Sequence, residues 1–351
     1  MKNLGMVGAV SCALLLSACG GSSSSTDIGQ DSASTTNTGQ DSSSSMTVEQ
    51  DTDNTKSLVI PFAAVVGSDP LKCDTTYSGI GTAGSDVTVK DLRFFVHDLA
   101  LVTDQGDILP VALDSDALAQ NDRVALLDFR DTAEVNAAGD LVEVCAAGNT
   151  GVNPTFKDTV EGTVELDTAV SIAAIKFTLG VPFDLNHESQ TDAEEPLRNP
   201  GLASGMTWNW QNGYKFLAAD VWPEGGVVRP ADPEWSNSRW NIHLGSTGCE
   251  VSASELDQGV APKVCPNENR IELTLPLNGV SVDEAAIQFD YKALVSGSNL
   301  GQDDGVSPGC MSSQTDPECE AIFERLALPW GTSPNSTGNP NAIVFSVVQK
   351  N

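Results

Sequence analysis

Two histidines and a closely spaced pair of tryptophans have the types and positions that could support metal chemistry. His187 and His243 lie where predicted strands run into loops, which is where binding sites usually form. Between them, the segment 206–216 begins with Met206 and carries Trp208 and Trp210, two residues apart. If this segment is extended, both indoles point to one face. Imidazole nitrogens with a thioether suit copper, above all Cu(I), which prefers soft ligands.

The same residue types also have ordinary structural roles. A lone histidine is more often structural than a ligand, and aromatic residues in a β-rich protein usually belong to the core. His97 lies in the apolar run 94–97, and we interpret it as a core-edge residue satisfied by a hydrogen bond. An intact indole cannot ligate a metal through nitrogen, because that lone pair belongs to the ring. A tryptophan would have to be oxidised first.

The chain from residue 57 predicts an all-β fold: an antiparallel β-sandwich with long loops and one short C-terminal helix. Short apolar or alternating runs are divided by Gly, Pro, Asn and Asp, and we see no repeat and no further boundary, so 57–351 is expected to be one domain. The expected strands are 58–66, 87–102, 123–129, 172–181, 214–221, 270–277, 286–295 and 342–348.

One helix and two long loops complete this prediction. Asp316 can cap a first helical turn and Pro317 suits its first position, while Cys319 and the apolar residues after it share one face. The segments 187–204 and 223–241 lack strand or helix periodicity. Long irregular segments are usually functional or disordered, and these two flank the tryptophan pair, which favours function.

The N-terminus predicts export and lipid attachment. A short basic start is followed by the apolar stretch 6–16, which is too short to span a bilayer. Residues 16–19 resemble the bacterial lipobox, which implies removal of 1–18 and acylation of Cys19; Gly20 is typical of transfer to the outer membrane, facing the periplasm. The alternative is an ordinary signal peptide with an incidental cysteine. Residues 19–56, rich in Ser, Thr and Asp, are predicted to be a disordered tether.

Six further cysteines in an exported chain predict disulfides. No Cys-x-x-Cys spacing supports a zinc knuckle or thioredoxin-like site. Sequence proximity favours the pairs Cys249 with Cys265 and Cys310 with Cys319, leaving Cys73 for Cys145.

Charge and motifs exclude several functions. With 48 acidic and 18 basic residues the formal charge is −30, which disfavours nucleic acid and anionic lipid, so membrane contact is expected through the N-terminal lipid only. We find no nucleophile elbow, phosphate loop, dinucleotide fingerprint or zinc-protease motif.

Several motifs, in order, resemble those of the MbnP-like periplasmic copper-binding proteins, also called metallo-mystery pair or four-Cys-motif proteins. The resemblance covers nearly the whole chain from residue 57, with Thr207 where the family usually has an aromatic. His97 has no counterpart. The motifs are 73–81, 177–187, 206–216, 243–249 and 310–319.

This resemblance implies a copper protein encoded beside a di-haem enzyme of the MauG and cytochrome c peroxidase type, which oxidises a tryptophan to kynurenine. Ring opening leaves an aryl amine and a ketone as new ligand atoms. By position, His187 and His243 would bind copper, Trp208 or Trp210 would be modified, and Met206 would be a soft contact or a packing residue.

We therefore expect a copper-binding protein of periplasmic copper handling that is not an enzyme. A surface β-sandwich adhesin or glycan-binding module with exposed tryptophans is the alternative. A redox enzyme with a copper centre is a third hypothesis.

Overall fold

The computed structural model describes most of the chain after its first fifty residues. The side chains described are those of residues 54–73, 75–116, 118–130, 157–167, 169–209, 212–252, 254–255, 258–331 and 344–350. Backbone alone is described for the two short strands at 134–135 and 141–142. Cys19, Cys145 and Trp210 lie outside the described residues.

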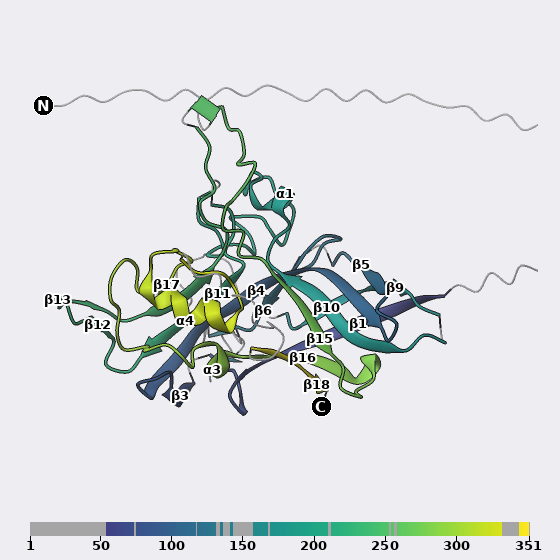
Figure 1. The fold of residues 1–351 in the computed structure, drawn as a ribbon, viewed down its shortest axis with the longest axis horizontal. Helices are drawn as coiled ribbons and strands as arrows, with labels where there is room; N and C mark the ends of the chain where they lie inside the picture. Colours follow the sequence, from purple (N-terminus) through teal and green to yellow (C-terminus); the bar gives the residue numbers. More distant parts are fainter. Residues whose placement is uncertain are drawn as a thin grey trace, which may run out of the picture. The chain divides into compact units, whose positions relative to one another are not determined.

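Eighteen strands and a few short helices make up this part of the chain (Figure 1). The first nine strands are β1 (Thr55–Val66), β2 (Asp69–Pro70), β3 (Thr76–Ile80), β4 (Ser85–Thr103), β5 (Ile108–Leu113), β6 (Ala125–Asp128), β7 (Glu134–Val135), β8 (Leu141–Val142) and β9 (Thr159–Glu165). The others are β10 (Ile172–Leu179), β11 (Leu217–Pro223), β12 (Val227–Arg229), β13 (Asp232–Asn237), β14 (Trp240–Leu244), β15 (Ile271–Pro276), β16 (Ala285–Asp290), β17 (Gly309–Cys310) and β18 (Phe345–Gln349). The helices are α1 (Phe183–Asn186), η1 (Val282–Glu284), α3 (Tyr291–Leu294) and α4 (Pro317–Arg325).

The long strand β4 is the centre of the fold and crosses the middle of Figure 1. It pairs antiparallel with β3, β5, β6, β10 and β11 along different parts of its 19 residues. Residues 91–97 of this strand are all buried, because other parts of the chain cover both of its faces. One face carries the aromatic core, in which Phe94 packs against Phe62, Phe129, Phe289 and Phe345.

The predicted all-β fold with long loops is confirmed, but the sheet is mixed. Most pairs are antiparallel, including β1 with β9, β10 with β15, and β11 with β14. Two pairs are parallel: β1 with β16, and β14 with β17. These parallel pairs join segments far apart in the chain, which alternation within one strand cannot reveal.

Two of the expected elements differ from the structure. The expected strand 286–295 ends at Asp290, whose side chain accepts a hydrogen bond from Lys292 N and caps α3. The segment 223–241, expected to be irregular, contains the hairpin β12–β13 and the start of β14. Most of β13 is exposed on both faces, so it lacks the alternation that marks a half-buried strand. The segment 187–204 has no strand or helix, as expected.

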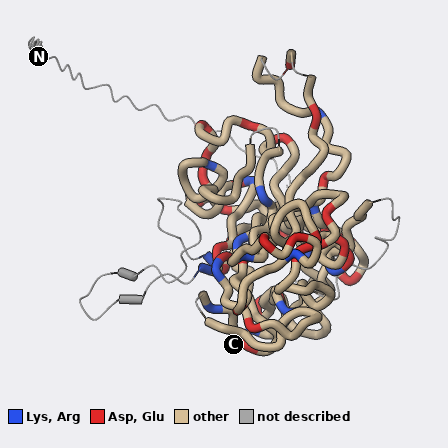
Figure 2. Tube along the Cα trace, turned by 90° about the vertical axis from the view of Figure 1, so that its left-hand side faces the viewer, with Lys and Arg blue, Asp and Glu red and all other residues tan. Residues whose placement is uncertain are grey.

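Disulfides and helix α4 follow the prediction where they are described. Cys249 is bonded to Cys265, and Cys310 to Cys319, which ties α4 to β17. Cys73 is also disulfide-bonded. No helix among the described residues is long and apolar enough to cross a membrane. Acidic side chains are spread along the described trace (Figure 2).

Helix α4 begins at a buried carboxyl group. Asp316 has no exposed surface and accepts a hydrogen bond from Glu318 N as the N-cap. Asp316 Oδ2 and Glu318 Oε2 are both buried without another hydrogen-bond partner. Burial, together with Glu318, raises the pKa of Asp316 to about 8. Asp316 is therefore protonated in the folded protein over much of the range in which it is ionised in the unfolded chain.

Asp316→Asn is expected to stabilise the protein at alkaline pH. A folded-state pKa above the unfolded value makes stability fall as pH rises from about 4 to about 8, and asparagine removes this loss while keeping the cap. We expect a gain of at least about 1 kcal/mol near pH 9 that shrinks toward pH 4, measured by urea unfolding. Glu324→Gln, on the exposed side of the same helix, is the control. A gain that did not change with pH would contradict the protonation of Asp316.

Candidate metal centre

The tryptophan segment 206–216 forms a tight hairpin. Thr207 bridges to Tyr214, and Trp208 N donates to Gly213 O at 3.0 Å. Gly213 N donates a hydrogen bond to Asn209 O at 2.8 Å, and Asn209 Oδ1 accepts one from Asn212 N. Residues 206–209 and 212–216 therefore run antiparallel to each other, so the described parts of this segment do not form one continuous strand. Gly213 has φ +74°, a conformation that glycine adopts without strain.

Both histidine-bearing segments contact this hairpin. Asn186, next to His187, accepts a hydrogen bond from Tyr214 N at 3.0 Å through Oδ1. A Cβ on Gly213 would lie 2.4 Å from the same Asn186 oxygen, so the two segments are in close contact. On the other side, a Cβ on Gly245 would lie 2.6 Å from Cζ3 of Trp208. Glycine at 245 lets the half-buried indole pack directly on the backbone that follows His243.

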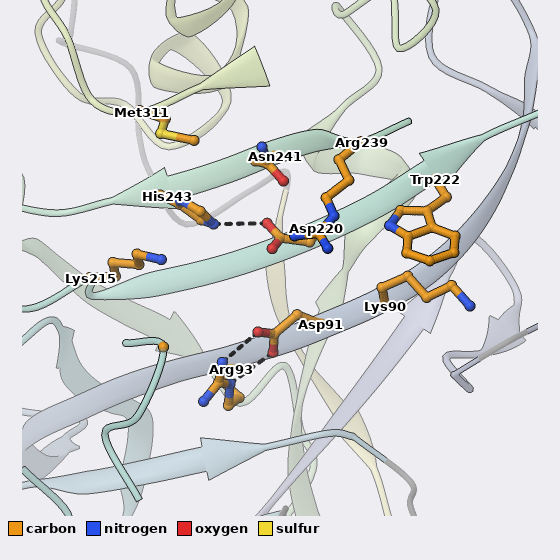
Figure 3. Close-up of a pocket in the computed structure, with 11 residues that line it drawn as sticks. Lys90, Asp91, Arg93, Lys215, Asp220, Trp222, Arg239, Asn241, His243 and Met311 are labelled. Carbon is orange, nitrogen blue, oxygen red and sulfur yellow. Dashed lines mark hydrogen bonds and ion pairs between the residues drawn. The ribbon is translucent and has the colours of Figure 1, made fainter. Parts of the chain in front are cut away.

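His243 lies on a polar face formed by β14, β11 and β4. Its Nε2 is 2.9 Å from Asp220 Oδ1 on the neighbouring strand, and Figure 3 shows the ring turned toward that carboxylate. The angle is not that of a hydrogen bond, so Asp220 Oδ1 remains without one. His243 is 8% exposed and lines a cavity of about 290 Å³ together with Met311. The contact is therefore an electrostatic one at the wall of the cavity.

Met311 lines a second cavity as well. Trp208, Asn209, Asn212 and Thr247 form the rest of this second wall. Met311 directly follows β17, which pairs with the strand of His243. Met311 therefore borders both the cavity that His243 lines and the cavity that Trp208 lines. In the sequence, Met311 is marked only by its place after Cys310 in the motif 310–319, and this position did not predict a ligand.

Met206, in contrast, has no exposed surface and is part of the hydrophobic core. Its backbone closes the base of the hairpin, where Lys215 N donates to Met206 O at 2.8 Å. Met206 was expected to be either a soft contact or a packing residue, and in the structure it packs in the core.

His187 lies in different surroundings, one residue beyond α1. Its ring packs on Phe183 with a centroid distance of 5.5 Å, and its Nε2 is 3.1 Å from Asn186 Nδ2 and 3.3 Å from Cys265 Sγ. Tyr214 N donates to Asn186 Oδ1, which identifies the other amide atom as nitrogen, a donor. Nε2 of His187 is therefore the acceptor, and the ring proton is on Nδ1.

A possible ligand cluster surrounds His187. Its ring nitrogen and the sulfurs of Cys249 and Cys265 lie within 4.8 Å of one another. Both sulfurs are joined in a disulfide, so neither is a thiolate, the form in which cysteine binds metals. In this oxidised state the imidazole is the ligand that the cluster can offer.

His97 is buried on β4 opposite Thr178. Its Nδ1 is 3.0 Å from Asp98 Oδ2, but without the angle of a hydrogen bond, and neither ring nitrogen has a hydrogen-bond partner. The expected satisfying hydrogen bond is therefore absent. Burial lowers the pKa of His97, although Asp98 opposes this effect.

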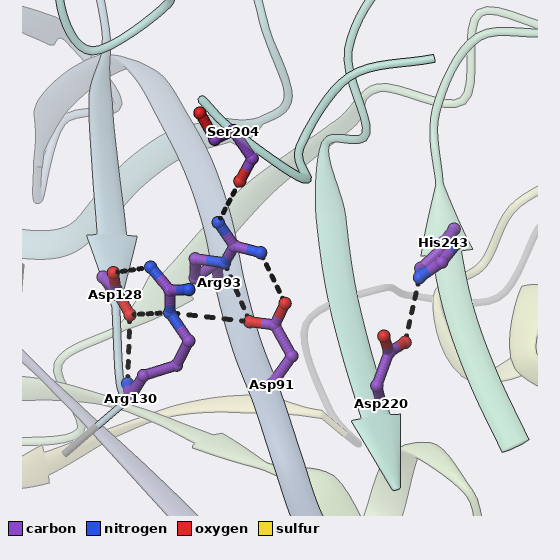
Figure 4. A network of polar contacts seen from close by, with 7 residues as sticks. All are labelled: Asp91, Arg93, Asp128, Arg130, Ser204, Asp220 and His243. Atoms are coloured by element: carbon purple, nitrogen blue, oxygen red, sulfur yellow. Dashed lines mark hydrogen bonds and ion pairs between the residues drawn. The ribbon is translucent and has the colours of Figure 1, made fainter. Parts of the chain in front are cut away.

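A buried ionic network adjoins the polar face that carries His243 and Asp220 (Figure 4). Arg93 donates to Asp91 through Nε at 2.8 Å and to Ser204 O through Nη1 at 2.8 Å. Arg130 donates to Asp128 at 2.9 Å. Burial opposes the ionisation of Asp91, but Arg93, with Arg130, outweighs it and holds the pKa of Asp91 below its ordinary value. The bond to Ser204 also anchors the irregular segment 187–204 on β4.

The donors around His243 fit a soft metal. Metal-binding histidines commonly donate the N–H of their second ring nitrogen to a carboxylate, and Asp220 lies near Nε2 of His243, although the angle of this contact is not that of a hydrogen bond. The Met311 thioether beside it is a ligand that Cu(I) prefers. His187 can contribute only after the Asn186 amide releases Nε2. His243 and Met311 are therefore the residues lining this cavity that could serve as ligands of a soft metal.

Comparison with known proteins gives one structural match and one family match. The solved structure of MbnP from Methylosinus trichosporium matches with a TM-score of 0.66 and 26% identity, over 84% of this chain and 99% of that one. No curated protein matches the chain. A family model described as MbnP matches residues 55–312, well over half of the 351 residues. The chain therefore belongs to the MbnP family.

Proposed function

We propose that this protein binds copper in the bacterial cell envelope and takes part in copper handling rather than catalysis. Membership of the MbnP family associates it with copper-related periplasmic proteins and with an accessory function. The observation that supports copper here is the position of Met311, which lines one cavity with His243 and another with Trp208. An imidazole, a thioether and an indole are thus brought to one region from three segments of the chain.

In this proposal His243 and His187 are the imidazole ligands and Met311 is an additional soft ligand. Copper bound there would be held as a cargo ion. Asp220 would hold the His243 ring through Nε2, and the Asn186 amide would control access to His187. Met206 packs the base of the hairpin and makes no direct contribution.

The tryptophan contributes after oxidation. With dioxygen as the oxidant, a di-haem enzyme of the MauG and cytochrome c peroxidase type would cleave the C2–C3 bond of the Trp208 or Trp210 indole to give N-formylkynurenine. Hydrolysis would then release the formyl carbon as formate and leave kynurenine. The aryl amine and ketone so formed are the donors that the indole lacks. Cζ3 and Cη2 of Trp208, which approach Gly245, belong to the six-membered ring, and this ring survives the opening. Trp208 can therefore be modified without losing its packing on Gly245. Lipid attachment at Cys19 would hold the protein at the outer membrane.

Removing the ligands one at a time tests this assignment. His243→Ala and Met311→Leu are each expected to weaken Cu(I) binding by about tenfold or more, as measured by competition with a chromogenic chelator. His187→Ala is expected to do the same. Leucine replaces methionine at similar volume, so Met311→Leu removes the sulfur with little change in packing.

Matched controls are present in the same chain. Met206→Leu removes a buried sulfur from the hairpin, and His97→Ala removes a buried histidine outside the two cavities. Both should leave copper affinity within about twofold, while His97→Ala changes stability. An equal loss of copper affinity in Met206→Leu and Met311→Leu would contradict the assignment of Met311 as a ligand. Unchanged copper binding in the double variant His187→Ala/His243→Ala would reject the site.

A further inference from the structure

The cavity beside His243 concentrates positive charge in a strongly acidic protein. Its lining includes Lys90, Arg93, Lys215 and Arg239 against only two carboxylates, Asp91 and Asp220 (Figure 3). Four positive and two negative side chains leave a formal local charge of +2, although the whole chain carries −30. Four of the 18 basic residues thus gather in one small cavity. Such a cavity attracts anions that the rest of the surface repels.

Part of this positive charge is not paired with the protein's own carboxylates. Arg93 is bound to Asp91 in the buried network. Among the described residues, neither Lys215 nor Arg239 forms an ion pair. Burial lowers the pKa of Lys215, although Asp220 and Asp91 oppose it, so a further negative charge nearby would stabilise its ammonium form. The cavity can therefore accept an external anion.

A β-bulge turns Lys90 toward this cavity. In the pairing of β11 with β4, Asp220 faces Asp91 and Val221 faces Val89, so Lys90 is the extra residue. A bulge lets consecutive residues point to the same face, and bulges are frequent next to functional sites. Lys90 and Asp91 consequently both line the cavity, where regular alternation would have separated them.

Apolar surface lies beside these charges. Trp222 is 37% exposed, with Lys90 Nζ 4.5 Å and the Arg239 guanidinium 5.9 Å from the centroid of its ring. A bare inorganic ion would leave this apolar surface unused, whereas an organic molecule would cover it.

We infer that this cavity binds a small organic anion with at least two carboxylate groups. Its volume of about 290 Å³ is at the lower end of the range for small-molecule sites. Lys215 and Arg239 bind the carboxylates, and Trp222 packs against the carbon skeleton. The site does not depend on copper, and it is separate from the oxidation of the tryptophan hairpin.

The test is calorimetric titration of the copper-free protein with citrate at low salt. We expect saturable binding of one citrate per chain and at least about tenfold weaker binding in the Lys215→Gln/Arg239→Gln double variant. The matched control is Lys56→Gln/Lys350→Gln, which removes two positive charges outside the cavity and should stay within about twofold of the parent.

Three outcomes would overturn the inference. These are absence of saturable citrate binding, equal weakening in the two double variants, and inorganic phosphate binding as tightly as citrate. The last would mark a site for simple oxyanions that makes no use of Trp222. Since no copper is present in the titration, each outcome is independent of whether the proposed copper ligands are correct.

Discussion

Replacing Arg93 with methionine is expected to lower the free energy of unfolding by about 3–5 kcal/mol, because it leaves the buried Asp91 carboxylate without its main partner. It also removes the donor to Ser204 O, which anchors the segment 187–204. Urea unfolding at neutral pH measures the first effect. Faster proteolysis within 187–204 would report the second.

The control for this loss is an exposed arginine. Arg123 pairs with Asp184 at 3.0 Å, but its side chain is 48% exposed, so Arg123→Met should cost less than about 1 kcal/mol. Adding Asp91→Asn to Arg93→Met should recover part of the loss, because no uncompensated charge then remains. Equal losses in Arg93→Met and Arg123→Met would show that the network does not stabilise the fold.

The deficit of Arg93→Met also depends on pH. In the parent protein the pKa of Asp91 is held below its unfolded value of 3.8, so its stabilising contribution is present above about pH 4 and is lost as pH falls through the folded pKa. In the variant the buried carboxyl favours the protonated form. The difference between the two proteins should therefore be largest near neutral pH and should shrink under acid.

Protein produced without the proposed di-haem partner is expected to bind copper at least about a hundredfold more weakly than protein produced with it. Two good ligand atoms are lost when the tryptophan remains an indole, and each tenfold change in affinity corresponds to about 1.4 kcal/mol. Competition titrations of the two preparations measure this difference. Peptide mass spectrometry across Met206 to Lys215 should show ring opening with loss of the formyl carbon only in the second preparation.

Single variants then identify the modified residue. Trp208→Phe co-expressed with the partner should behave like the unmodified protein if Trp208 is the residue that reacts, and Trp210→Phe should not. Trp208 packs on Gly245, so its variant should be compared by unfolding as well as by copper titration. Copper-loaded protein from native cells with both tryptophans intact would exclude oxidation from the mechanism.

The sequence by itself determined those features that depend on nearby residues. The cap at Asp316, the proline after it and the buried face of α4 lie within one short stretch, and the helix forms there. Alternating runs such as 271–275 identified strands, and short spacing identified the disulfides Cys249–Cys265 and Cys310–Cys319. The two histidine segments and the tryptophan segment were also recognisable as motifs.

Tertiary structure alone decided which side chains those segments bring together. Met206 is the methionine beside the tryptophans in sequence, yet the hairpin buries it, and the parallel pair β14–β17 brings Met311 to His243 instead. The bulge at Lys90 similarly overrides strand alternation. Pairing between strands is set by contacts across long stretches of chain and by register, and a single residue of register reverses the face on which a side chain lies. The spacing of residues within one segment therefore does not predict which strands pair or in which register.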